Sequence, residues 1–103
     1  MFPVDSIAGR RSELNELIAS DNLSRATVLL MDFTRDFSDK RDDVNRAIII
    51  RSSFTRVKKR EQEGLLNYDE AEKRKVQLLY QMLSFMDELE DEFIRKSKKM
   101  TDE

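Results

Sequence analysis

The chain has 103 residues, of which 39% are charged, yet its formal net charge is only −2. This length suits one domain with one core, and a near balance of both signs with 2 glycines and 1 proline is typical of a helical protein. The absence of cysteine and histidine excludes disulfides, thiolate nucleophiles and Cys/His metal sites. No apolar run approaches the roughly 18 residues of a membrane span. The first five residues lack the pattern of a signal peptide, so we expect a soluble cytoplasmic protein.

The first expected helix runs from about Ser12 to Ser20, with Ser12 as its N-cap. Its apolar face consists of Leu14, Leu17 and Ile18. Residues 1–11 form either an extended N-terminal arm or, if the helix begins early at Ile7, its first turns.

A second helix follows the short polar connection at residues 20–22. Its apolar residues recur at steps of 3, 4, 3 and 4, which predicts an amphipathic helix with one buried face. They are Leu23, Ala26, Leu30, Phe33 and Phe37. The polar segment 38–43 then predicts a break with good capping residues.

The third and fourth expected helices span about 42–63 and about 68–96. The apolar residues of the third are Ala47, Ile50, Phe54 and Val57. The fourth carries two adjacent stripes, formed by Leu78, Met82, Phe85 and Leu89 and by Val76, Leu79, Leu83, Met86 and Phe93. Two stripes make a wide apolar arc, so this helix is expected at the centre of the bundle. Residues 97–103 are expected to fray.

The segment between these two helices carries the strongest turn signal in the chain. Gly64 can adopt positive φ and end a helix, while Asn67 and Glu70 have the spacing of a capping box at the start of the next one. The sequence therefore predicts a helical hairpin here.

The expected fold is all-α, with residues 1–103 forming a single-domain four-helix bundle. Short connections favour antiparallel neighbours. The third and fourth helices should form a long antiparallel hairpin, with the first two packed as a shorter pair on its apolar side. The large residues expected in the core are Phe33, Phe37, Phe54, Phe85 and Met86. Tyr80 falls beside the main arc and is expected to be partly exposed.

Nothing in the sequence predicts catalysis. Histidine, the commonest general acid–base residue, is missing, and no glycine-rich phosphate loop occurs. A di-metal carboxylate bundle would need Glu-x-x-His pairs, which this chain cannot supply. We therefore expect a non-enzymatic protein with no cofactor and no metal.

Charge is distributed unevenly along the expected hairpin. A basic group is formed by Arg51, Arg56, Lys58, Lys59, Arg60, Lys73 and Arg74, and an acidic group by Asp87, Glu88, Asp91 and Glu92. One interpretation is that these are solvated helix faces. The sharper one is a dipolar molecule, whose two patches bind a protein partner carrying a similar domain or meet between copies.

Two other functions stay open at this point. A structural or regulatory homodimer would use an apolar interface, for which Phe85, Leu89 and Phe93 are candidates. A nucleic-acid binder would use the basic run, but the net charge is negative and no aromatic residue interleaves with that run. Nucleic acid is therefore the less favoured partner.

The assembled pattern is similar to a known family over residues 14 to about 89. The similarity is carried by the segment Leu14–Ala26, by Ile48–Ile50 with the charged run to Gly64, by Tyr68–Glu72, and by the apolar series Val76, Leu79, Leu83 and Leu89. The chain resembles the bacterial effector-associated domains, in particular their eleventh type. This resemblance implies an all-helical adaptor that couples sensors to effectors such as peptidases, TIR domains or NTPases in bacterial conflict and signalling systems. It supplies no catalytic residue.

Overall fold

Four helices make up the protein in a computed structural model that describes residues 4–101. They are α1 (Val4–Ala19), α2 (Leu23–Phe37), α3 (Arg41–Gln62) and α4 (Tyr68–Thr101). No strand occurs within the described range, which confirms the all-α class. The molecule is elongated, with principal extents of 57 × 26 × 16 Å.

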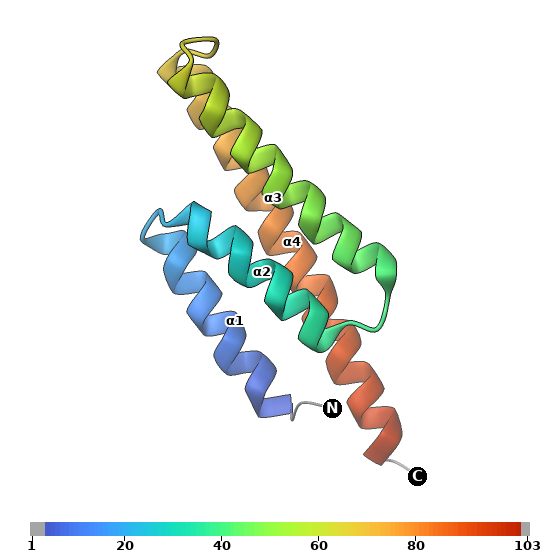
Figure 1. The fold of residues 1–103 in the computed structure, drawn as a ribbon. Helices are drawn as coiled ribbons and strands as arrows, with labels where there is room; N and C mark the ends of the chain where they lie inside the picture. The colour runs from blue at the N-terminus through green and yellow to red at the C-terminus, as the bar shows by residue number, and fades with distance from the viewer. Residues whose placement is uncertain (1–3, 102–103) are drawn as a thin grey trace.

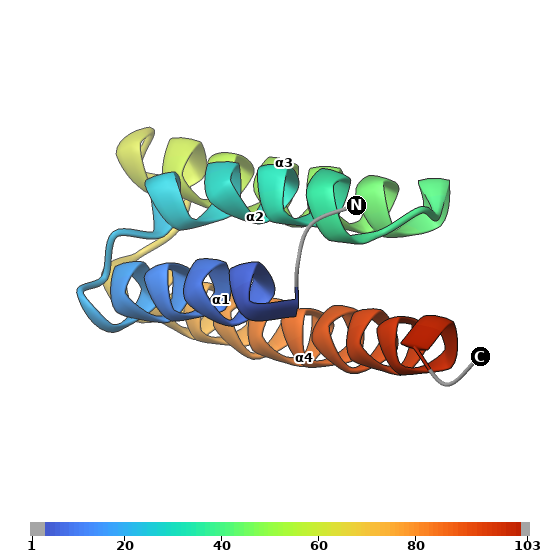
Figure 2. The same ribbon diagram turned by 90° about the horizontal axis from the view of Figure 1, so that it is seen from below.

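The helices form two layers. Successive helices run in opposite directions, and α1 lies with α4 in one layer while α2 lies with α3 in the other (Figures 1 and 2). α2 contacts all three other helices, and α1 also packs on α4. The turn between α3 and α4 projects beyond the ends of α1 and α2 (Figure 1). This projecting end, here called the tip, leaves part of α3 and α4 uncovered.

The N-terminal helix begins earlier than expected. It starts at Val4, so Ser12 lies inside the helix and is not an N-cap. Ile7 is almost fully buried in the core, which explains the early start and excludes an extended arm over residues 4–11. At the other end, α4 continues past the expected limit at Lys96. Residues 1–3 and 102–103 of the expected arm and tail lie outside the described range.

The turn at Gly64 has the geometry that the sequence predicts. Gly64 has a φ of 75°, and its N–H and that of Leu65 donate to the carbonyls of Glu61 (3.2 Å) and Arg60 (2.9 Å). These two bonds form a Schellman motif, which satisfies the last carbonyls of α3. Gly64 thus ends α3 and turns the chain toward α4.

The start of α4 is capped by Asn67. Its side-chain oxygen accepts the backbone N–H of Glu70 at 2.8 Å. The Glu70 carboxylate accepts from the side-chain amide of Asn67 at 2.9 Å, and no bond to the Asn67 backbone N–H is formed. The N-cap is therefore confirmed, but the reciprocal half of the capping box is replaced by a side-chain pair.

A second Schellman motif joins α1 to α2 without a glycine. Asp21 has a φ of 61°, and its N–H donates to the carbonyl of Ile18 at 3.0 Å. The N–H of Asn22 donates to the carbonyl of Leu17 at 2.8 Å. The sequence predicts a tight connection here, but not the left-handed conformation of an aspartate.

Two clusters of buried side chains stabilise the fold. The larger fills the space between the layers and consists of Ile7, Leu14, Ala26, Leu30, Phe33, Phe37, Ala47, Ile50, Met82, Phe85, Met86, Leu89 and Phe93. The smaller lies toward the tip and consists of Leu23, Phe54, Val57, Leu66, Ala71 and Leu78. All five large residues expected in the core are buried. Val76 is the exception among the apolar stripes, because it is 45% exposed near the uncovered tip.

Candidate protein-interaction surface

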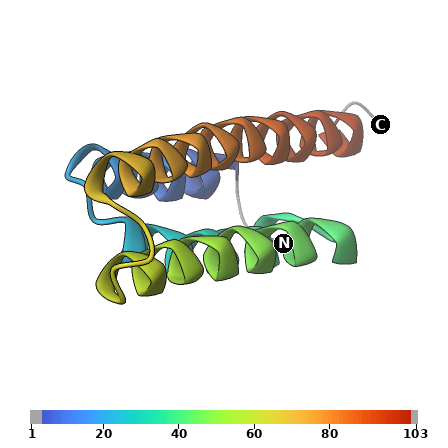
Figure 3. The same cartoon turned by 90° about the horizontal axis from the view of Figure 1, so that it is seen from above.

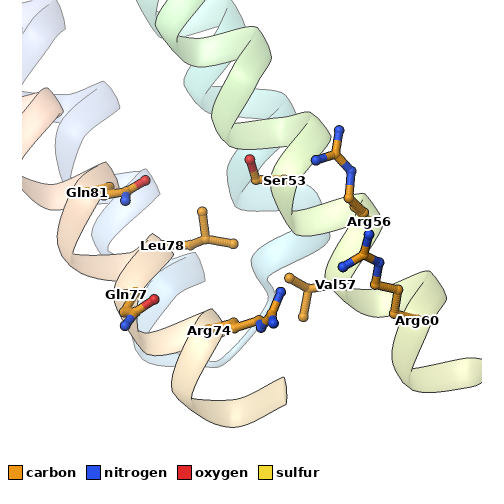
Figure 4. A pocket seen from close by; sticks show the side chains of 8 residues that line it. All are labelled: Ser53, Arg56, Val57, Arg60, Arg74, Gln77, Leu78 and Gln81. Carbon is orange, nitrogen blue, oxygen red and sulfur yellow. The ribbon is translucent and has the colours of Figure 1, made fainter. Parts of the chain in front are cut away.

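Three arginines from two helices meet near the tip. Arg56 and Arg60 of α3 and Arg74 of α4 line one shallow pocket of about 260 Å³. Figure 4 shows Arg74 extending from α4 toward α3, with Val57 and Leu78 facing each other between the helices. These two apolar residues belong to the smaller core cluster, which holds the helices at this spacing. The fold therefore brings together basic residues that are separated by the turn in sequence.

The three arginines, here called the basic cluster, have no acidic partner among residues 6–99. No carboxylate of this range lies within 4.0 Å of their guanidinium groups. The nearby Glu61 is occupied by Lys75, whose ammonium lies 3.0 Å from it. This hydrogen bond raises the pKa of Lys75 above its usual range. The basic cluster thus presents free, exposed donors that suit carboxylate or phosphate groups.

The neighbouring lysines extend the positive charge without adding a fixed geometry. Lys58 and Lys73 are exposed and, within the described side chains, form no ion pair. Lys59 has only a loose pair with Glu63, at 3.9 Å. Such exposed pairs contribute little energy, so these lysines remain available to a partner.

Arg51 is placed differently from the other expected contact residues. It is partly buried and donates to the backbone carbonyl of Ser24 and to the hydroxyl of Thr27, at 2.9 Å each. Thr27 is itself buried in α2. Arg51 therefore ties α3 to α2 within the molecule, and the expected role in partner contact does not fit its position.

The acidic group expected as the complementary patch is largely compensated by cations from α1, α3 and the connection between α2 and α3. Asp87 pairs with Arg11 of α1 at 2.8 Å. The two other paired members are Glu88, 2.7 Å from Arg46, and Glu92, 2.6 Å from Lys40. The bond from Lys40 lowers the pKa of the Glu92 carboxyl. Asp91 is exposed and forms no pair with a described side chain.

This compensation makes the two ends of the α3–α4 pair unequal. The carboxylates of Asp87, Glu88 and Glu92 already have counter-charges, whereas the guanidinium groups of the basic cluster have none in the described structure. An acidic partner would gain new ion pairs at the tip. A basic partner at the other end would compete with existing ones.

Exposed apolar residues lie between the two ends. Ile49 of α3 is 62% exposed and Tyr80 of α4 is 69% exposed. Both line a groove of about 420 Å³ between the helices, together with Arg46, Ile50, Gln81 and Ser84. Gln81 also lines the pocket of the basic cluster, so the groove and the pocket are adjacent.

The apolar interface that we considered for a homodimer is wrong. Phe85, Leu89 and Phe93 are all buried in the larger core cluster and are not available to a second molecule. The run Ile48–Ile50 was the signal that sequence reasoning could have used. Successive residues of a helix point 100° apart, so one helix face cannot bury all three.

The described side chains offer no evident metal site. No group of three or more carboxylates in this range is arranged to hold a metal ion. Within residues 4–101, no helix combines the length and the apolar character that crossing a membrane requires.

Comparison with known proteins identifies the family of this chain. The model of the family described as effector-associated domain 11 matches residues 9–90, which include most of α1, all of α2 and α3, and the tip. No curated protein and no solved structure gives a match. The matched segment agrees with the resemblance carried by the helical pattern and the turn at Gly64. The chain belongs to the effector-associated domain 11 family.

Proposed function

We propose that this domain is a non-enzymatic adaptor that recruits or clusters an effector by binding a protein partner. The observation that carries the proposal is the basic cluster, whose exposed guanidinium groups have no acidic partner among the described residues. A cluster of like charges is unfavourable in isolation, and an acidic surface would relieve the repulsion. Membership of an effector-associated family supports an effector-linked partner.

The chemistry of the basic cluster indicates an acidic surface on that partner. A guanidinium group presents parallel N–H donors to a carboxylate, which adds geometric selectivity to charge. One exposed ion pair contributes only about 0.2–1 kcal/mol, so several must act together. Binding should therefore weaken as ionic strength rises.

The biological setting of the proposal is bacterial defence or signalling in the cytoplasm. The partner is an effector or sensor that carries a similar helical domain. In this role the protein brings effector molecules close together, and any catalytic activity belongs to the partner.

The proposal is tested by charge reversal within the basic cluster. Arg56→Glu with Arg74→Glu is compared with the control Arg25→Glu with Lys99→Glu, which changes the net charge equally at exposed residues away from the tip. Binding to effector-associated domains carried by effector proteins is measured by calorimetry at low salt. We expect the first pair of substitutions to weaken binding at least ~10-fold and the control to change it little.

Two results would contradict the proposal. The first is equal binding by both double variants, which would place the contact elsewhere. The second is binding to a nucleic-acid duplex with a steep loss of affinity as salt rises, which would assign the basic cluster to phosphate groups.

A further inference from the structure

The outer seam of α3 and α4 carries one continuous stripe on each helix. Steps of three and four residues keep each stripe on one helix face. The α3 stripe is Asp42, Arg46, Ile49, Ser53, Arg56 and Arg60, and the α4 stripe is Arg74, Gln77, Gln81, Ser84, Glu88 and Asp91. The groove and the basic pocket lie on this seam. Figure 3 shows α3 and α4 in front of α1 and α2, so no other helix covers it.

Charge along the seam follows a symmetric order around its apolar middle. Arg56 and Asp42 each lie seven residues from Ile49, on opposite sides. Arg74 and Glu88 lie at the same separation from Gln81. Seven residues of helix correspond to about 10 Å. The seam is therefore basic toward the tip and apolar in the middle. Its far end carries Asp42, Glu88 and Asp91 together with one cation, Arg46, which is paired with Glu88.

This order makes the surface complementary to itself in only one of two symmetric arrangements. A two-fold axis along the seam would place the two basic ends together. A two-fold axis across the seam would place each α3 antiparallel to the other α3, and each α4 antiparallel to the other α4. The basic end of one molecule then faces the acidic end of the other, twice per dimer.

We propose that the α3–α4 seam binds a second copy of this chain in this antiparallel arrangement. Ile49 and Tyr80 lie near the axis and pack against the same residues of the second copy. Arg56 faces Asp42 of the second copy, and Arg74 faces its Glu88. Glu88 remains accessible because the carboxylate is mostly exposed even while it is paired with Arg46.

The proposed dimer is weak and exchanges with monomer. The groove is shallow, and Ser53, Gln77 and Ser84 add polar surface to the seam. Small and polar interfaces of this kind are typical of transient association. The inference rests on the proposed function, because it names a second copy as a partner of the basic cluster. It is tested by mass alone, so its failure would leave binding to a different domain intact.

The test uses two complementary double variants. The basic variant is Arg56→Glu with Arg74→Glu, and the acidic variant is Asp42→Arg with Glu88→Arg. All four residues are exposed, so circular dichroism should show unchanged helix content. Light scattering is measured across concentration at low salt. Wild type should rise from 12.2 kDa to twice that mass and stop there.

Each variant alone should dimerise at least ~10-fold more weakly than wild type, because like charges then face each other. An equimolar mixture should recover the dimer, because both sets of ion pairs are restored with reversed signs in one set. No single-site loss of packing produces this recovery. The restored mixture is therefore the result that supports the antiparallel arrangement.

The apolar middle of the seam is tested with a matched pair of tyrosines. Tyr80→Ala should weaken the dimer about tenfold, whereas Tyr68→Ala should leave it unchanged. The two residues are equally exposed, at 69% and 70%, but Tyr80 lines the groove, whereas Tyr68 lines neither the groove nor the basic pocket.

Several outcomes would overturn the proposal. A wild-type mass that stays at one chain up to millimolar concentration would exclude the second copy. A mass that keeps growing beyond two chains would indicate head-to-tail assembly instead of a closed dimer. A mixture that fails to recover the dimer, or equal effects at the two tyrosines, would place the contact outside this seam.

Discussion

Replacing Gly64 with alanine should destabilise the protein, while the same replacement at Gly9 should stabilise it. Gly64 has a φ of 75°, where an L-residue with a Cβ loses about 1–2 kcal/mol. The substitution also makes the unfolded chain less flexible, because alanine has fewer backbone conformations than glycine. This effect offsets roughly 0.4–1 kcal/mol of the loss. Apart from the chain neighbours of Gly64, no heavy atom lies within 4 Å of the added Cβ, so backbone conformation decides the result. The net cost is about 1 kcal/mol.

Gly9 is the matched control because it lies in α1 and, apart from its chain neighbours and the backbone of its own helix, no heavy atom lies within 4 Å of an added Cβ. In an exposed helix, alanine is favoured over glycine by about 0.8–1 kcal/mol. Urea unfolding monitored by circular dichroism should therefore show shifts of opposite sign for Gly64→Ala and Gly9→Ala. In a domain of this size, 1 kcal/mol corresponds to roughly 4–8 °C in Tm. Equal or greater stability of Gly64→Ala would refute the role given to the turn.

Three further predictions concern contacts that the sequence did not reveal or only partly revealed. Arg51→Met should cost about 1–3 kcal/mol in urea unfolding, because it removes two hydrogen bonds to α2, one of them to the buried Thr27. Asn67→Ala should cost about 1 kcal/mol in the same assay, because the first turn of α4 loses its cap. Glu92 has a lowered pKa from its bond to Lys40, so its contribution is complete above the ordinary Glu pKa and is lost as pH falls through the folded value. Glu92→Gln should therefore flatten the loss of stability as pH falls below the ordinary Glu pKa of 4.5.

The prediction for Arg51 has a control in the same chain. Arg56→Met should change stability by less than about 0.5 kcal/mol, because Arg56 makes no ion pair with a described side chain. If it costs as much as Arg51→Met, the bonds to α2 are not the cause. If the stability of Glu92→Gln depends on acidic pH in the same way as that of wild type, the pair with Lys40 does not change the pKa of Glu92 on folding.

The local sequence pattern is sufficient to predict the bounds of helices whose apolar stripes are regular. The stripe from Leu23 to Phe37 predicts the bounds of α2, and Gly64 with Asn67 predicts the end of α3 and the start of α4. For the N-terminal turns of α1, the sequence left an extended arm and an early helix start at Ile7 as alternatives. There, Ile7 is isolated from the next apolar residues by a polar segment, and its burial depends on packing with the other helices.

Tertiary pairing explains what the sequence could not show about the interaction surface. Arg51 and Arg56 look alike in one basic run, and only the approach of α2 separates an internal anchor from an exposed donor. From the sequence alone, the acidic run at the far end of α4 likewise appears as a set of unpaired carboxylates. Its members Asp87 and Glu88 are compensated by Arg11 and Arg46, which come from other helices.

The meeting of Arg56, Arg60 and Arg74 was accessible to sequence reasoning, because a hairpin must bring both sides of its turn together. The groove next to them was only partly accessible. The exposure of Tyr80 is confirmed, whereas that of Ile49 follows from the way α3 packs its other face against α2 and α4. The apolar interface of a homodimer was expected at Phe85, Leu89 and Phe93, which are buried.

The α3–α4 seam is the surface at which we expect other proteins to bind. Amide chemical shifts of isotopically labelled protein, followed from dilute to concentrated solution and then with an effector-borne domain, test this directly. The predicted result is shift changes centred on Ile49, Arg56 and Gln81 that diminish in high salt. Changes confined to the outer faces of α1 and α2, for example around Arg25 and Val28, would contradict the account.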